Sequence, residues 1–298
     1  VKNKKKHNDY TAFKDYSLEK QHEILEKLEA IKSYDGNNNP QRIAVLDTDI
    51  PIQYKAVALR KMNMLDTMEP GSNEHYKLKQ WVDAFMRIPF NHYSNLPLTI
   101  KDGVDKTHEF MSNAMDTLNH AVYGLNDAKI QIMQMIGQWI TNPSALGTAI
   151  SIKGPMGTGK TTLVKDGISK ILGRDFAFIA LGGATDSSVL EGHSYTYEGS
   201  TWGKIVDILL QGKTMNPVIY FDELDKISNT PKGEEIAHIL THLTDTTQNN
   251  QFHDKYFSEI ELDLSRCLFI FSYNEEDKVN PILRDRMYKI TTVGYSVK

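Results

Sequence analysis

The chain has 298 residues and carries 34 Lys and Arg residues against 38 Asp and Glu residues, for a net charge of −4. With 40% hydrophobic and 24% charged residues, the composition excludes a wholly disordered or fibrous chain and predicts a packed core. The small net charge provides no overall attraction to nucleic acid or to an anionic membrane, so we expect neither partner. No apolar stretch approaches the roughly 18 residues that a membrane-spanning helix needs.

The first part of the chain is expected to be helical. Segment 1–16 is rich in Lys and Asn and predicts a flexible basic tail. Across 17–118, apolar residues mostly recur at helical spacing, as at Leu78, Trp81 and Phe85, which places them on one face of a helix. We therefore predict an all-helical arm over residues 17–118.

The pattern changes in residues 119–298, where short apolar runs alternate with helical patterns. This alternation predicts crossover connections and a mostly parallel sheet covered by helices on both faces. The five predicted strands are 149–152, 176–181, 218–221, 268–271 and 288–293. Cys267 is the only cysteine and directly precedes the fourth predicted strand, so we expect its side chain to be small and buried. Since a single cysteine cannot form an internal disulfide, we expect the protein to work in a reducing compartment inside the cell, with the cytoplasm as the first choice.

One segment matches the phosphate-loop pattern at every fixed position, and it reads Gly154-Pro155-Met156-Gly157-Thr158-Gly159-Lys160-Thr161. A predicted strand precedes it, and a predicted helix begins at Thr162. The backbone N–H groups of such a loop surround phosphate oxygens, and its lysine adds positive charge between the β- and γ-phosphates. We predict that residues 154–162 bind ATP, with the Thr161 hydroxyl as a ligand of Mg²⁺.

A pair of carboxylates supports this prediction. Asp222 and Glu223 directly follow the predicted strand 218–221, and parallel nucleotide-binding sheets bind their ligands at the carboxyl ends of strands. Asp222 is predicted to hold Mg²⁺, and Glu223 to polarise a water molecule toward the γ-phosphate. Together the two motifs predict ATP hydrolysis.

Less generic segments resemble the ATPase module of the Lon protease family, the ring-forming AAA+ machines that unfold and thread polypeptides. These segments are Leu181-Gly182-Gly183, Glu191-Gly192-His193, 248–252, Asp263-Leu264-Ser265 and Asp285-Arg286-Met287. Upstream, 58–94 resembles the helical arm of that family, and Tyr123-Gly124-Leu125 resembles its adenine-side motif. The resemblance implies a P-loop AAA+ fold of the α/β class, with an all-helical region before a core that covers 119–298.

The resemblance also implies roles for two residues after the fourth predicted strand. Asn274 matches the polar sensor that helps to position the attacking water molecule. Arg286 matches the arginine finger that acts on the ATP of a neighbouring subunit. Arg284 is a nearby alternative for the arginine finger, but the Asp-Arg-Met context favours Arg286. A finger that acts on another subunit implies a homo-oligomeric ring, which is expected to be a hexamer.

Residues 192–203 resemble the first pore loop, in which an aromatic side chain grips any polypeptide by apolar contact. Tyr197 matches that aromatic residue, whereas Glu198 stands where an aliphatic residue is common and Trp202 where proline is common. For Tyr195 and Trp202, burial in the core is an equally good interpretation. The loop contains no Arg or Lys, which counts against a nucleic-acid motor on the same fold.

The function implied by the resemblance is ATP-driven unfolding and translocation of polypeptide substrates, as the motor part of a Lon-like protease in protein quality control. The alternative is a nucleotide-binding scaffold or chaperone-like AAA+ protein without associated proteolysis. The sequence ends at Lys298, before the helical lid and the Ser-Lys protease domain of that family, so we expect the natural protein to continue. His238 and His242 are spaced i, i+4 but lack the glutamate of the zinc-protease pattern, so we interpret them as the polar flank of a packed helix.

Overall fold

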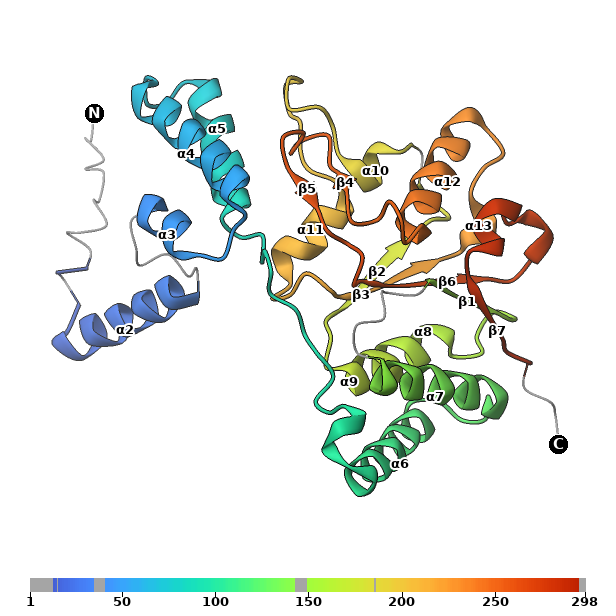
Figure 1. Cartoon of the computed structure of the whole chain (residues 1–298). Helices are drawn as coiled ribbons and strands as arrows, with labels where there is room; N and C mark the ends of the chain where they lie inside the picture. Colours follow the sequence, from blue (N-terminus) through green and yellow to red (C-terminus); the bar gives the residue numbers. More distant parts are fainter. Residues whose placement is uncertain (1–12, 15, 35–40, 143–148, 185, 295–298) are drawn as a thin grey trace, which may run out of the picture.

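The computed structural model describes residues 13–14, 16–34, 41–142, 149–184 and 186–294. Its centre is a five-stranded parallel sheet with the order β2-β3-β6-β1-β7 (Figure 1). The strands are β1 (Ala149–Lys153), β2 (Phe176–Ala180), β3 (Val218–Asp222), β6 (Leu268–Tyr273) and β7 (Tyr288–Thr291). All five predicted strands are therefore confirmed, as is the predicted α/β class with a helical region before the sheet.

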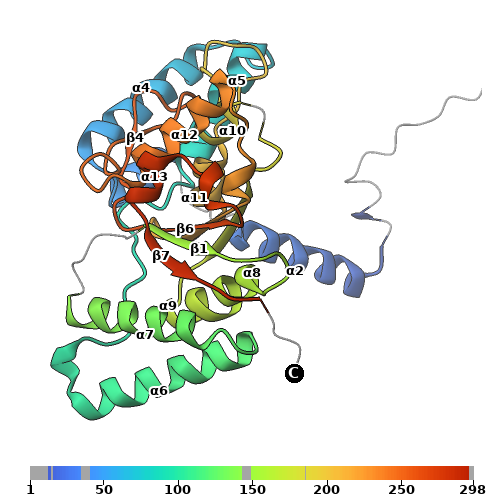
Figure 2. The same ribbon diagram turned by 90° about the vertical axis from the view of Figure 1, so that its right-hand side faces the viewer.

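Alternate residues of the strands face two separate apolar cores. Ile152 and Tyr220 pack on one face, against α6 (Val104–Ala121), α7 (Asn126–Thr141) and the continuous helical stretch α8, η2 and α9 (Lys160–Thr162, Leu163–Ile168 and Ser169–Leu172). Phe221 and Phe271 pack on the other face, against α11 (Lys204–Gln211) and α12 (Pro231–Thr244). Figure 2 shows α6 and α7 on one side of the sheet and α11 and α12 on the other. Because both faces are covered, the central strands consist almost entirely of apolar residues.

The predicted arm of residues 17–118 extends too far along the chain. Ala114 and Leu118 of α6 are buried in the core beneath the sheet, and the side chain of Leu118 approaches Gly167 of η2 so closely that a Cβ there would lie 2.8 Å from it. Tertiary packing thus places α6 with the sheet, and the boundary falls in the connection between α5 (Asn73–Phe85) and α6. The predicted tail 1–16 lies almost wholly outside the described residues.

The arm itself is a helix pair, α4 (Ile52–Thr67) and α5, which packs against the upper part of the molecule (Figure 1). The Ser72 side chain caps α5 by accepting a hydrogen bond from the backbone of the first turn, and the apolar stripe of the helix is buried. Trp81 stacks on Phe85 with ring centroids 5.2 Å apart and meets Phe257 of the sheet domain at 5.3 Å. The arm is therefore joined to the sheet domain by an aromatic core.

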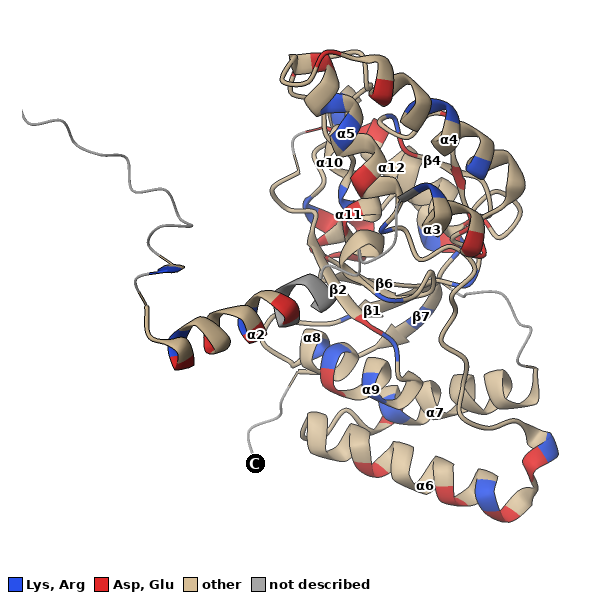
Figure 3. Cartoon of the chain, turned by 90° about the vertical axis from the view of Figure 1, so that its left-hand side faces the viewer, with Lys and Arg blue, Asp and Glu red and all other residues tan. Residues whose placement is uncertain are grey.

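The remaining described elements are short or peripheral. They are α2 (Leu18–Tyr34), α3 (Gln41–Asp47), η1 (Ile100–Asp102), α10 (Ser188–Glu191), η3 (Leu224–Lys226), the antiparallel pair β4 (Phe252–His253) and β5 (Glu261–Leu262), η4 (Glu276–Lys278) and α13 (Pro281–Asp285). Figure 3 shows both signs of charge distributed along the helices rather than separated onto one element. Among the described residues, no helix is long and apolar enough to cross a membrane.

Candidate active site

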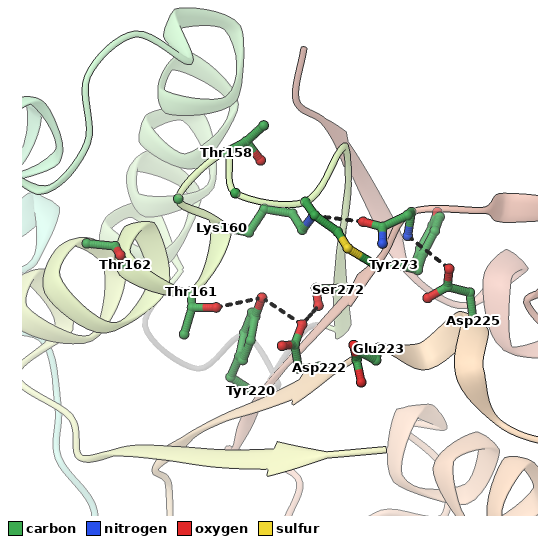
Figure 4. A pocket seen from close by; sticks show the side chains of 14 residues that line it. Thr158, Lys160, Thr161, Thr162, Tyr220, Asp222, Glu223, Asp225, Ser272 and Tyr273 are labelled. Atoms are coloured by element: carbon green, nitrogen blue, oxygen red, sulfur yellow. Dashed lines mark hydrogen bonds between the residues drawn. The ribbon is translucent and has the colours of Figure 1, made fainter. Parts of the chain in front are cut away.

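The predicted phosphate loop connects the end of β1 to the first turn of α8, at the carboxyl edge of the sheet (Figure 4). The bend depends on Gly157 and Gly159, whose φ angles of +74° and +82° lie in the left-handed region that favours glycine. Gly154 starts the loop by donating a backbone hydrogen bond to the Tyr273 carbonyl of β6. Thr158 is buried and its hydroxyl donates to the Pro155 carbonyl at 3.0 Å, which braces the bend.

The Lys160 ammonium lies within this loop. Nζ donates to the carbonyl oxygens of Gly154 at 2.7 Å and Pro155 at 2.8 Å, and to Oδ1 of Asn274 at 3.1 Å. Burial lowers the pKa of Lys160, and the negative charges of Asp222 and Asp225 oppose that shift. The lysine is therefore a partly desolvated cation surrounded by oxygen acceptors. The oxygens of a bound phosphate would surround it in the same way.

The predicted metal ligands are joined by a chain of hydroxyl groups. Asp222 accepts a hydrogen bond from the Ser272 hydroxyl of β6 and lies 3.5 Å from the Tyr220 phenol, which in turn lies 3.4 Å from Thr161 Oγ1 (Figure 4). Burial raises the pKa of Tyr220, so its phenol stays protonated and can donate. Two oxygen groups that could bind Mg²⁺, the Thr161 hydroxyl and the Asp222 carboxylate, thus line one site.

Glu223 has a backbone conformation that is uncommon for a residue with a side chain. Its φ and ψ angles are +60° and +46°, in the left-handed region, and such strain concentrates at functional sites. Its carboxylate lies against the backbone of Gly182, where an added Cβ would lie only 2.2 Å from Oε2. The turn that follows β2 therefore touches the carboxylate that we predict to activate water.

These side chains surround a single cavity of about 380 Å³. It is lined by Met156, Gly157, Thr158, Gly159, Lys160, Thr161, Thr162, Tyr220, Asp222, Glu223, Asp225, Ser272, Tyr273 and Asn274. The structure thus brings together nearly all residues of the predicted phosphate and acidic motifs with Asn274. Gly154 and Pro155 form the base of the loop without lining the cavity.

Tyr123 lines a separate cavity of about 520 Å³, formed by residues 123–128 and 291–294. The two cavities are neighbours across the phosphate loop, since a Cβ on Gly159 would lie 3.0 Å from the Val122 side chain, and one on Gly294 would lie 3.5 Å from Pro155. The Tyr123 side chain is largely exposed at this opening.

Arg286 lies away from the cavity of Lys160. It directly follows α13 and forms an ion pair with Asp245 at 2.8 Å, and it also donates to the Thr241 carbonyl at 3.1 Å. The side chain of Arg284, the alternative arginine finger, is 36% exposed, which equals the exposed fraction of the Arg286 side chain. Arg284 lies 4.0 Å from the carboxylate of Asp285. The structure therefore places neither arginine in the site of its own chain.

The loop 192–203 has a buried base and an exposed tip. Tyr197 is 67% exposed and Glu198 is exposed as well. Tyr195 and Trp202 instead pack edge-on against the buried ring of Tyr256, at 5.3 and 5.6 Å between centroids. The core interpretation of these two aromatics is therefore correct, and only Tyr197 is left as an exposed aromatic ring at the tip.

Contacts with the rest of the molecule hold both the base and the tip of this loop. Asp254 is fully buried and accepts a hydrogen bond from the Gly203 amide at 2.8 Å, and burial raises the pKa of this carboxyl to about 6. On the arm side, Lys77 donates to the Tyr197 carbonyl at 3.1 Å and lies 4.6 Å from the centroid of the Tyr195 ring. The arm helix α5 thus contacts the loop directly.

The cysteine and the paired histidines have ordinary structural surroundings. Burial raises the pKa of the Cys267 thiol to about 12, and the thiol donates to the Met215 carbonyl, as expected for a core residue. His238 and His242 lie with ring centroids 4.5 Å apart on α12. Within the described ranges, no group of three or more His, Cys, Asp or Glu side chains is arranged to hold a metal ion.

The sequence motifs did not identify four residues of the cavity, which are Tyr220, Asp225, Ser272 and Tyr273. Ser272 and Tyr220 contact Asp222, and Asp225 is buried beside Asn274. A signal existed for Tyr220 and Ser272, because each is a hydroxyl residue within an otherwise apolar strand. Nothing local distinguishes Asp225 from a surface carboxylate, since its burial depends on the packing of β6.

Comparisons with known proteins agree with this geometry. Residues 150–295 match the model of the ATPase family associated with various cellular activities (AAA). A Lon protease homolog of Acanthamoeba polyphaga mimivirus is 37% identical over 84% of this chain and 24% of its own length. Lon protease 2 of Bdellovibrio bacteriovorus and the Lon protease of Fusobacterium nucleatum are each 32% identical over 92% of this chain, and over 33% and 34% of their own lengths.

The chain thus spans about a quarter to a third of the length of these relatives. The match to the AAA model includes the phosphate loop, the acidic pair, Asn274 and Arg286, and the similarity to the Lon proteins extends over most of the chain. The matched residues also cover nearly all of the five-stranded parallel sheet. Residues 150–295 therefore form an AAA ATPase domain, and the chain is similar over most of its length to the Lon-type AAA+ module.

Proposed function

We propose that this module binds Mg·ATP in the cavity around Lys160 and hydrolyses it. The observation that carries the proposal is the convergence of Lys160, Asp222, Glu223 and Asn274 on one cavity at the carboxyl edge of a parallel sheet. A buried ammonium among oxygen acceptors fits a triphosphate, and a hydroxyl beside a carboxylate fits a hard divalent cation. The residues present thus fit both groups.

The roles of the chain's own residues follow from their positions. Lys160 would exchange its carbonyl acceptors for phosphate oxygens, and Thr161 and Asp222 would hold Mg²⁺, which when bound neutralises charge on the phosphate oxygens. Glu223 would accept a proton from the attacking water molecule, and the Asn274 amide would orient that water. The adenine would occupy the neighbouring cavity beside Tyr123.

Replacing Glu223 by Gln tests this proposal. The variant keeps the size of the side chain but removes the base, so we expect ATP to bind within about twofold of the wild-type affinity while turnover falls on the order of 10²-fold or more. Glu234→Gln, a change of an exposed glutamate in the first turn of α12, serves as the matched control and should hydrolyse ATP normally. Unchanged hydrolysis in Glu223→Gln would show that the water is activated elsewhere.

We further propose that the module acts as the motor of a Lon-like protease in a homo-oligomeric ring, expected to be a hexamer. Arg286 lies outside its own cavity, which is compatible with a role at the ATP of a neighbouring copy. Tyr197 is exposed at the tip of a loop whose base is fixed by Asp254 and whose tip is contacted by Lys77 of the arm. Its aromatic side chain could grip a polypeptide. Closure around ATP would then move the substrate.

A stimulation assay separates this motor from a nucleotide-binding scaffold. ATP turnover is measured with and without casein as an unfolded substrate, for the wild type and for Tyr197→Ala. We expect casein to raise wild-type turnover at least about twofold and to have less effect on the variant, because the loop aromatic is the group that contacts the substrate. Casein-independent turnover in both proteins would favour the scaffold.

A further inference from the structure

We propose that Asp225 is a positioning residue for ATP hydrolysis, which holds the backbone after β6 so that the Asn274 side chain faces Lys160. This inference rests on the function proposed above. Asp225 lies in η3, three residues after the Asp222 that ends β3, and it lines the cavity. Its side chain is nevertheless buried, with only 3% of the residue exposed. A carboxylate at this depth requires polar partners, and their identity indicates its role.

The partners are two backbone amides at the end of β6. Oδ2 of Asp225 accepts hydrogen bonds from the N–H groups of Glu275 at 3.1 Å and of Asn274 at 3.4 Å. The same Asn274 accepts a hydrogen bond from Lys160 through its side-chain Oδ1 at 3.1 Å. One carboxylate thus fixes the backbone of the residue whose side chain contacts the phosphate-loop lysine.

The second oxygen of this carboxylate is not used by the fold. Oδ1 of Asp225 is buried and has no hydrogen-bond partner among the described residues, although the residue lines the cavity. Buried acceptors in folded proteins are nearly always paired, so this oxygen calls for a donor that the described residues do not supply. A water molecule of the ATP-loaded site is such a donor, which would join Asp225 to the same hydrogen-bonded group as Asn274.

A double-mutant cycle distinguishes positioning from a merely structural role. The variants are Asp225→Ala, Asn274→Ala and the double variant, measured on the full chain at saturating and limiting ATP. We expect Asp225→Ala to lower kcat about tenfold with KM for ATP within about twofold, because the phosphate loop is untouched. If Asp225 acts through Asn274, the double variant should be no slower than Asn274→Ala alone.

Two further variants control for folding and for local charge. Asp225→Asn keeps an oxygen that can accept from both amides, and we expect kcat within about threefold of the wild type. Asp277→Ala removes an exposed carboxylate two residues beyond Glu275 and should leave both kinetic constants unchanged. Hydrogen exchange in a peptide covering 272–278 provides a readout without ATP: exchange should accelerate in Asp225→Ala and remain near wild type in Asp225→Asn.

The possible failures are separable. Losses that multiply in the double variant, or unchanged exchange across 272–278 in Asp225→Ala, would overturn the role of Asp225 while leaving the ATPase intact. A rise in KM with unchanged kcat would also overturn it, since the residue would then act in binding. A wild-type chain that does not hydrolyse ATP would overturn the proposed function, and the role of Asp225 with it.

Discussion

Replacing Gly182 by Ala should slow ATP hydrolysis without weakening ATP binding. Gly182 and Gly183 form the turn after β2, closed by a hydrogen bond from the Ala184 amide to the Leu181 carbonyl, and neither glycine has a left-handed backbone. Alanine is therefore compatible with the backbone at both positions. What differs is the space around each Cβ.

The structure sets the size of the effect. A Cβ on Gly182 would lie 2.2 Å from Oε2 and 3.2 Å from Cδ of the Glu223 side chain, whereas a Cβ on Gly183 would meet nothing within 4 Å. Real Cβ contacts are rarely below 3.0 Å, so the carboxylate must move by the order of 1 Å. A misplacement of about 1 Å can reduce turnover by about 10²-fold, and we expect a loss between tenfold and that value.

The assay compares Gly182→Ala with Gly183→Ala, which carries the same chemical change one residue away. Steady-state turnover gives kcat and KM for ATP, and thermal unfolding reports on the fold. We expect kcat to fall in Gly182→Ala alone, with KM and the melting temperature close to wild type because the moving atoms are the flexible end of one side chain. Equal turnover in the two variants would refute the idea that the turn after β2 positions Glu223.

Two further predictions concern stability. Trp81→Ala should lower the free energy of unfolding by about 3–5 kcal/mol, because it empties the aromatic contact with Phe257 that joins the arm to the sheet domain. Tyr76→Ala, at an exposed site of the same helix, should change it by less than about 0.5 kcal/mol in the same urea titration. Hydrogen bonds and ion pairs with Lys153 at the end of β1 and with Lys289 in β7 hold the pKa of Glu276 at about 2, below its ordinary 4.5. The wild type should therefore exceed Glu276→Gln in urea resistance at pH 7, and this advantage should disappear as the pH falls from about 4.5 toward 2, where the carboxylate takes up its proton. A constant difference between pH 7 and pH 2 would contradict this assignment.

The predicted fold depended on patterns that are local in the chain. The five strands were predictable because each is a short apolar run bounded by breaks. The phosphate loop and the pair Asp222 and Glu223 were predictable because neighbouring residues carry the whole motif. A helix such as α6 is equally recognisable, but its sequence does not say which surface its apolar stripe covers. For that reason the predicted arm included residues of α6 that pack against the sheet.

By itself, then, the sequence determined the α/β class, the residues of the phosphate loop and the acidic pair that follows β3. Only the tertiary structure decided that Asn274 meets Lys160 across 114 residues and that Asp225 is buried beneath it. It also decided that Tyr195 belongs to the core while Tyr197 is exposed, although both are tyrosines in one loop. The physical reason is common to these cases: burial and long-range hydrogen bonds arise from the meeting of segments that are distant in the chain, and no local pattern encodes which segments meet.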